Sequence, residues 1–166
     1  LVVSVADGVL VVRRKTMGMS WSDAQTATVT VTMPVLASAA ISGSGDLTAD
    51  RAAADSVAAT LSGSGDLSIA TVDAKTVALS LAGSGDLKIG GGKADSGDLG
   101  LAGSGDMDAS GLSLANASVS LAGSGDIALT ATGAVKASLV GSGDVRVSGG
   151  AKCDSNAIGS GEVICG

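Results

Sequence analysis

One short motif, Gly-Ser-Gly-Asp or its variant Gly-Ser-Gly-Glu, recurs seven times from residue 43 onward. The copies begin at positions 43, 63, 83, 103, 123, 141 and 159, so the spacing is constant over the first five copies and becomes two positions shorter after that. A fixed period of this length is typical of solenoid proteins, in which each repeat forms one coil that stacks on its neighbours. The spacing therefore predicts a repeat architecture.

The residues around each motif predict that the coils are built from β-strands. In the first copy, apolar residues and glycines take the odd positions from Ile41 to Ala49, and mostly polar residues take the even positions. A strand sends alternate residues to opposite faces, so one face is apolar and the other polar. The later, shorter spacing differs by an even number of positions, which shortens a corner without turning a strand inside out.

These features predict an all-β, single-stranded parallel β-helix with 18–20 residues per coil. Each coil has two strands and a variable side, which holds residues 50–55, 71–75 and 90–93. Coils that stack ~4.8 Å apart place equivalent side chains over one another. We expect one apolar ladder of Leu47, Leu67, Leu87, Met107, Ile127, Val145 and Val163, and a second of Leu61, Leu81, Leu101 and Leu121.

Two other folds are compatible with the motif. Gly-Ser-Gly-Asp could close hairpins in an antiparallel meander or sandwich, and a glycine-rich chain can also be disordered. Stacked corners have to be identical, whereas hairpin turns do not, which favours the β-helix. The regular Val and Leu ladders argue against disorder.

Residues 1–40 lack the motif, and we predict that they form the opening coils of a single domain spanning residues 1–166. Residues 1–6 and 9–12 are β-branched runs separated by Asp7-Gly8, which predicts a hairpin. A polar loop follows to residue 25, with Met17, Met19 and Trp21 inside it, and Thr26–Thr32 alternates as a strand does. Pro34 suits a bend. The chain begins at Leu1 rather than at methionine, so an upstream segment is expected.

The composition excludes several classes of function. There is no histidine, which removes the commonest general base and the commonest zinc ligand. The net charge is −6 and Trp21 is the one aromatic residue, a combination that argues against nucleic-acid binding and against docking to an anionic membrane. No apolar run is long enough for a transmembrane segment. We predict no catalytic residues and no cofactor.

Several stretches resemble the head GIN domain family of autotransporter adhesins. They are Thr30 to Leu36, Ile41 to Asp46 with the tandem motifs that follow, and the upstream Asp7 to Leu10. The resemblance covers nearly the whole chain. It implies a right-handed β-helix in a bacterial cell-envelope protein, with no catalytic residues to carry over.

The acidic residues of the motifs form the first candidate site. Asp46, Asp66, Asp86, Asp106, Asp126 and Asp144, with Glu162, are predicted to lie on one edge ~5 Å apart. Like charges at that distance repel by ~1 kcal/mol per pair in water, which a calcium ion could relieve. The favoured alternative is structural, with each Asp capping its own turn through backbone N–H groups.

The motif glycines are the second candidate. They are Gly43, Gly45, Gly63, Gly65, Gly83, Gly85, Gly103, Gly105, Gly123, Gly125, Gly141, Gly143, Gly159 and Gly161. Glycine pairs also cradle phosphate groups, but those loops precede a helix and carry further signature residues that are absent here. We therefore predict a structural role in the corners.

Cys153 and Cys165 are the third candidate. By register, Cys153 falls where Val135 lies in its coil, and Cys165 falls where Val147 lies, so both are expected to point inward. A disulfide that staples the C-terminal coil is predicted, with two unpaired core thiols as the alternative and zinc disfavoured by the absence of histidine. A disulfide implies an oxidising compartment.

These inferences predict a non-catalytic β-helical module for adhesion or scaffolding in the bacterial cell envelope, whether periplasmic, outer-membrane-associated or extracellular. The partners expected are a cell-surface glycan, a protein, or a second copy joined by strand edges or end to end. The alternatives are a carbohydrate-binding or carbohydrate-cleaving β-helix and a calcium-stabilised solenoid.

Overall fold

The computed structural model describes residues 1–13 and 27–166, and it divides into two compact units, Leu1–Met33 and Pro34–Gly166. The prediction that residues 1–40 form opening coils of one domain with residues 41–166 stays a prediction.

The first unit contains the predicted hairpin. Strand β1 (Val2–Ala6) pairs antiparallel with β2 (Val9–Arg13). Asp7 and Gly8 connect them with φ angles of 52° and 77°, and two consecutive positive φ values are what a tight two-residue hairpin turn requires. The Asp-Gly prediction is therefore confirmed.

The strand predicted over Thr26–Thr32 is wrong for its described part. Residues 27–32 are exposed and lie in no strand. β-propensity reflects how a side chain fits a paired, half-buried surface, and within the described ranges these residues pair with no strand. Pro34 does lie in a bend. Thr26 and the predicted polar loop with Met17, Met19 and Trp21 lie outside the described residues.

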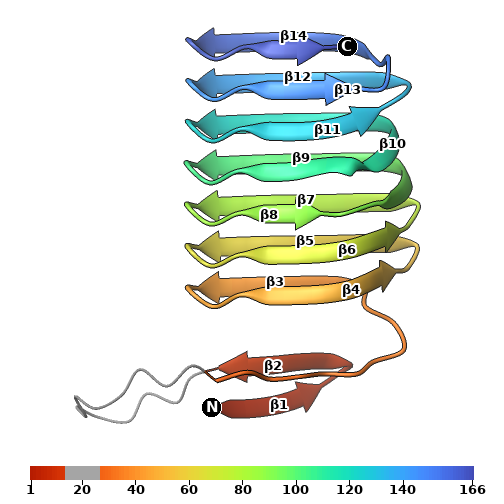
Figure 1. The fold of residues 1–166 in the computed structure, drawn as a ribbon, viewed down its shortest axis with the longest axis vertical. Helices are drawn as coiled ribbons and strands as arrows, with labels where there is room; N and C mark the ends of the chain where they lie inside the picture. Colours follow the sequence, from red (N-terminus) through yellow and green to blue (C-terminus); the bar gives the residue numbers. More distant parts are fainter. Residues whose placement is uncertain (14–26) are drawn as a thin grey trace, which may run out of the picture. The chain divides into compact units, whose positions relative to one another are not determined.

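The second unit is a parallel β-solenoid (Figure 1). Each coil runs along the near side, returns along the far side and advances by one layer, which is the right-handed winding expected of parallel crossovers. Every strand pair in this unit is parallel. The predicted β-helix is therefore confirmed, and the antiparallel alternative is wrong.

The strands form two facing walls. Wall A precedes the motif in each coil and contains β3 (Ser38–Gly43), β5 (Ser56–Gly63), β7 (Thr76–Gly83), the later parts of β9 (Gly92–Gly103) and β10 (Met107–Gly123), β12 (Ala134–Gly141) and β14 (Lys152–Gly159). Wall B follows the motif and contains β4 (Leu47–Ala53), β6 (Leu67–Asp73), β8 (Leu87–Ile89), the first part of β10, β11 (Ile127–Ala131), β13 (Val145–Ser148) and β15 (Val163–Cys165).

Side chains of the two walls meet in a continuous apolar core. Both predicted ladders exist in register, for example Leu67 with Leu87 on wall B and Leu81 with Leu101 on wall A. Their members are buried except Leu47 and Val163 near the ends of the stack, which are half-buried. Among the described residues no polar or charged side chain is buried. Each fully buried Leu, Ile or Val contributes ~1.5–3 kcal/mol.

The change of period is absorbed on the variable side, and no strand is turned inside out, as the even difference predicts. Strands β10 and β11 pair in register at Ala109 and Leu129, shift between Ala109 and Ser113, and resume at Ser113 with Thr130. At the next wall A strand, Ala117 already pairs with Val135, so the shorter spacing is in place there. The walls therefore keep their inward and outward residues while the connection changes length.

Candidate functional site at the Gly-Ser-Gly-Asp corner

Each motif forms the corner between wall A and wall B, and adjacent corners are joined by backbone hydrogen bonds. The carbonyl oxygen of Gly63 accepts from the N–H of Ser84 at 2.9 Å and from the N–H of Gly85 at 3.3 Å. The same pair of bonds recurs from each motif to the next along the stack. From the second corner onward, the N–H groups that could cradle a phosphate are therefore already bonded to the preceding coil.

The corners also explain why both glycines are needed. The first glycine of the motif has a positive φ, for example +134° at Gly83, which is unfavourable for other residues. A side chain at the second glycine has no room, because a Cβ atom on Gly85 would overlap the carbonyl oxygen of Gly65 in the coil below. The geometry thus supports the corner-forming role proposed for these glycines.

The motif aspartates form a ladder between coils. In every step the N–H of one acidic residue donates to the Oδ1 atom of the equivalent aspartate in the preceding coil. These bonds run from Asp66 to Asp46 (3.0 Å), Asp86 to Asp66 (3.1 Å), Asp106 to Asp86 (3.2 Å), Asp126 to Asp106 (2.9 Å), Asp144 to Asp126 (2.8 Å) and Glu162 to Asp144 (3.0 Å).

This ladder corrects one detail of the sequence-based interpretation. The aspartates cap a backbone N–H, but the N–H belongs to the next coil rather than to the same turn. The N–H of Asp86 already donates to Asp66, and the Asp86 carboxylate accepts from the N–H of Asp106 in the next coil. Within the described residues no three acidic or cysteine side chains are grouped so that they could hold a metal ion. Calcium binding along this edge stays a prediction.

Basic side chains neutralise part of the acidic edge. Arg146 contacts Asp126 at 3.4 Å and Asp144 at 3.0 Å.

Lys88 lies 3.6 Å from Asp108, which is on the outer face of wall B. The pKa of Asp108 lies below its ordinary value, chiefly because the Ser110 hydroxyl donates to its Oδ1 atom at 2.6 Å. Desolvation opposes this effect, whereas the Ser110 N–H and the charge of Lys88 add to it.

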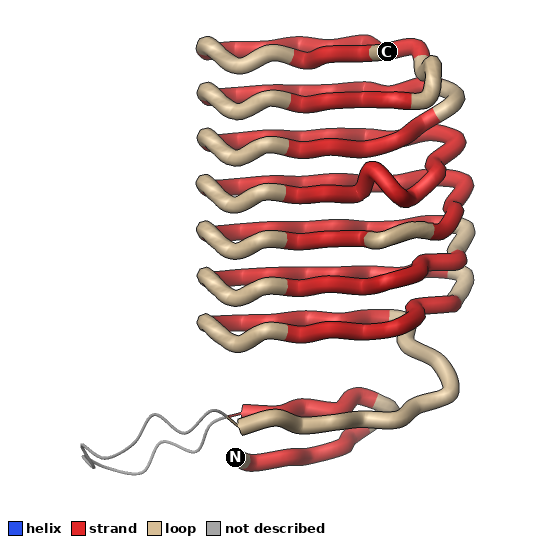
Figure 2. Tube along the Cα trace, viewed as in Figure 1, coloured by secondary structure: helices blue, strands red, loops and turns tan. Residues whose placement is uncertain are grey.

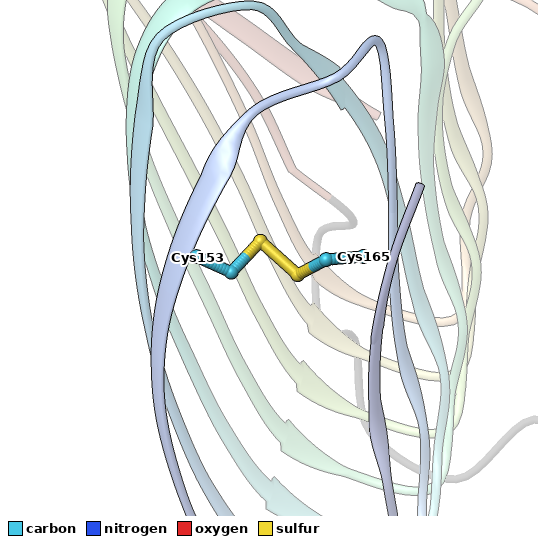
Figure 3. The surroundings of a disulfide bond; sticks show 2 residues. All are labelled: Cys153 and Cys165. Atoms are coloured by element: carbon cyan, nitrogen blue, oxygen red, sulfur yellow. A yellow bond between two sulfur atoms is a disulfide. The ribbon is translucent and has the colours of Figure 1, made fainter.

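The two cysteines form the predicted disulfide (Figure 3). Cys153 is on β14 of wall A and Cys165 is on β15 of wall B, with their Cα atoms 6.5 Å apart. They pair in register with Val135 and Val147, as the sequence predicts. The bridge therefore crosses the interior of the last coil and joins the two walls.

The outer face of wall A was not predicted as a candidate site. Two shallow hollows lie on it, of about 320 Å³ and 230 Å³, and Ser120 lines both. The larger is also lined by Lys136 and Asn156, and the smaller by Gly100. The signal was present in the sequence, because small residues occupy most outward positions of this wall.

Comparison with solved structures supports the fold. A "putative adhesin" from Parabacteroides distasonis is 30% identical, with a TM-score of 0.63 over 79% of this chain and 64% of that one. A "putative adhesin" from Parabacteroides merdae is 21% identical, with a TM-score of 0.58 over 76% of this chain and 57% of that one. A "putative lipid binding protein" from P. distasonis is 24% identical, with a TM-score of 0.59 over 78% of this chain and 58% of that one.

The chain spans less than two thirds of the length of each of these three structures. A comparison with curated proteins gives no match. Among the described residues, no helix is long and apolar enough to cross a membrane.

The comparison with family signatures agrees with the fold and with the repeated corner. Residues 1–151 match the family described as "Putative auto-transporter adhesin, head GIN domain", which includes six of the seven motif copies. The chain therefore belongs to the head GIN domain family.

Proposed function

We propose that this chain is a non-catalytic β-helical module of the bacterial cell envelope or surface, which acts in adhesion or as a scaffold. The observation that carries the proposal is the corner ladder of a chain that belongs to the head GIN domain family. Backbone and carboxylate bonds join each coil to the next, which gives a stiff, extended surface rather than an enclosed pocket.

The compartment follows from the disulfide. Bonds such as Cys153–Cys165 persist in oxidising surroundings and are rare where thiols are kept reduced. The proposed location is therefore periplasmic, outer-membrane-associated or extracellular. The partner on the adhesion side is a cell-surface glycan or a surface protein.

Attachment of the folded chain to defined surfaces tests this proposal. Beads coated with the purified chain are applied to immobilised polysaccharides and to immobilised extracellular proteins. The matched control is beads coated with the same chain after reduction and unfolding. Saturable attachment that requires the folded chain supports adhesion, and attachment confined to polysaccharides identifies a glycan-binding module.

Two results contradict the proposal. Equal attachment by folded and unfolded chains shows that the β-helix is not the adhesive element. Release of soluble sugar from a polysaccharide by the purified chain shows that the protein is an enzyme rather than a non-catalytic module.

A further inference from the structure

The outer face of wall A differs from the rest of the solenoid in charge and in side-chain size. Its outward residues form four rows that run from coil to coil in register, and in the last five coils the row nearest the variable side is Thr76, Ser96, Asn116, Ala134 and Lys152. In these five coils the entry row is Ala78, Asp98, Ser118, Lys136 and Asp154; the centre row is Ser80, Gly100, Ser120, Ser138 and Asn156; the corner row is Ala82, Ala102, Ala122, Val140 and Ile158. None of the five ion pairs in the described part of the chain lies on this face.

The large apolar residues of this face are gathered at one end. Val140 is 51% exposed and Ile158 is 62% exposed, whereas the same row holds Ala82, Ala102 and Ala122 towards the other end. The smaller hollow is lined by Ser80, Ala82, Gly100 and Ala102, among others. The corner row therefore protrudes at one end, and the smaller hollow lies towards its other end. The larger hollow, beside Lys136 and Asn156, lies at the protruding end.

The entry row holds two opposite charges placed symmetrically about one strand, and a third charge, Asp154, whose counterpart on the other side is Ala78. Asp98 and Lys136 lie on the strands directly before and after the strand of Ser118. Both side chains are exposed, and neither takes part in an ion pair within the described residues. An acidic and a basic residue at equal distances from a central position are complementary to a copy of the same face turned over.

We propose that wall A is the interface of a face-to-face dimer with a second copy of this chain. The twofold axis runs parallel to the strands through Ser118 and Ser120, so coil order is reversed while each row lies on the same row of the partner copy. Asp98 then faces the second copy's Lys136 and Lys136 faces its Asp98. Val140 meets Ala102, and Ile158 enters the hollow beside Ala82.

The area fits a weak, specific dimer. Five coils overlap in this arrangement, spaced ~4.8 Å apart, and their strands of about eight residues rise ~3.3 Å per residue. Each copy therefore covers ~600 Å² of the other copy's wall A. The total of ~1,200 Å² lies at the lower end of specific interfaces, which predicts a dimer that dissociates on dilution. Small side chains along the centre row allow the two sheets to approach closely.

Charge exchange tests the pairing. Sedimentation velocity of the whole chain over a range of concentrations is expected to show a monomer–dimer equilibrium. Lys136→Glu and Asp98→Lys each replace two attractive contacts with two repulsive ones, and each should weaken dimerisation by about tenfold or more. The double variant Asp98→Lys with Lys136→Glu restores the dimer. The matched control, Lys93→Glu on the variable side, should leave dimerisation within about twofold of the unchanged chain.

Cross-linking tests the position of the axis. Both native cysteines are paired, so Ser120→Cys introduces a single free thiol. On the axis this thiol meets its own copy, and mild oxidation should give a covalent dimer. The control Ser80→Cys faces the second copy's Asn156 instead, and should cross-link at least tenfold more slowly. A chain that stays monomeric at every concentration, a double variant without rescue, or equal cross-linking of the two thiol variants overturns the proposal.

Discussion

The motif corner and the variable side lie at opposite edges of the same coils, yet they constrain the sequence very differently (Figure 2). At the motif corner the same backbone bonds recur in each layer, and no side chain fits at the second glycine from Gly65 onward. On the variable side the bonds change along the stack: Lys75 and Thr76 donate to the Asp55 carbonyl and Asp95 and Ser96 to that of Lys75, whereas Gly133 donates to that of Ala115. Stacking therefore restricts the choice of residue only where the backbones of adjacent coils touch and leave no room for a side chain.

Replacing a motif glycine should give the largest effect. A methyl group in Gly85→Ala would overlap the Gly65 carbonyl, and we expect a loss of roughly 3 kcal/mol in the free energy of unfolding. The matched control is Gly91→Ala on the variable side, where the nearest atom to an added Cβ is 3.8 Å away, and it should change stability by less than about 0.5 kcal/mol. Urea denaturation of both variants measures the difference. Equal losses would show that the two edges are equally constrained.

Removing the disulfide should give the next largest effect. Cys153→Ser with Cys165→Ser opens a bridge with a sequence separation of 12, and bridges that close loops of this size contribute ~2–3 kcal/mol. The loss should be local at first, because the bridge joins the two walls within one coil. Amide hydrogen exchange is therefore expected to accelerate in β14 and β15 while β5 and β7 stay protected. Uniform acceleration through all coils would contradict this.

The aspartate ladder should contribute less per step. Asp86→Ala and Asp86→Asn both remove the charge, but only Asn keeps an oxygen that can accept from the Asp106 N–H. We expect the Ala variant to be about 1 kcal/mol less stable than the Asn variant, which is the net value of one hydrogen bond. Thermal or urea unfolding of the pair measures this. Identical stabilities would mean that the ladder bonds contribute nothing.

A local contact near the variable side should give the smallest effect. The folded-state pKa of Asp108 is lowered, chiefly by the Ser110 hydroxyl, so the ionised form is favoured by folding. This stabilisation is present above the ordinary aspartate pKa and is lost as the pH falls through the lowered value. The melting temperature of Asp108→Asn should therefore fall below that of the unchanged chain near neutral pH and converge with it in acid. A constant difference at every pH would contradict the assignment.

Much of this fold could be predicted from the sequence because the inward residues that flank each motif stay on odd-numbered positions in every coil. The alternation around Leu67 and Ile69 recurs in each coil, so the core ladders, the parallel stack and the inward cysteines follow from counting. The partner of each aspartate could not be predicted, since the choice between the N–H of its own turn and that of the next coil depends on backbone geometry. The absence of a strand at residues 27–32 depends on a missing pairing partner, which local propensity does not report.

From the second copy onward, each Gly-Ser-Gly-Asp or Gly-Ser-Gly-Glu corner is bonded directly to the corner of the preceding coil. Scalar couplings across hydrogen bonds, measured by nuclear magnetic resonance between amide nitrogens and carbonyl carbons, detect such bonds individually. We expect a coupling from the Ser84 amide to the Gly63 carbonyl, repeated for Ser104 with Gly83 and Ser124 with Gly103. Couplings that instead join residues within one motif, as in a hairpin turn, would contradict it.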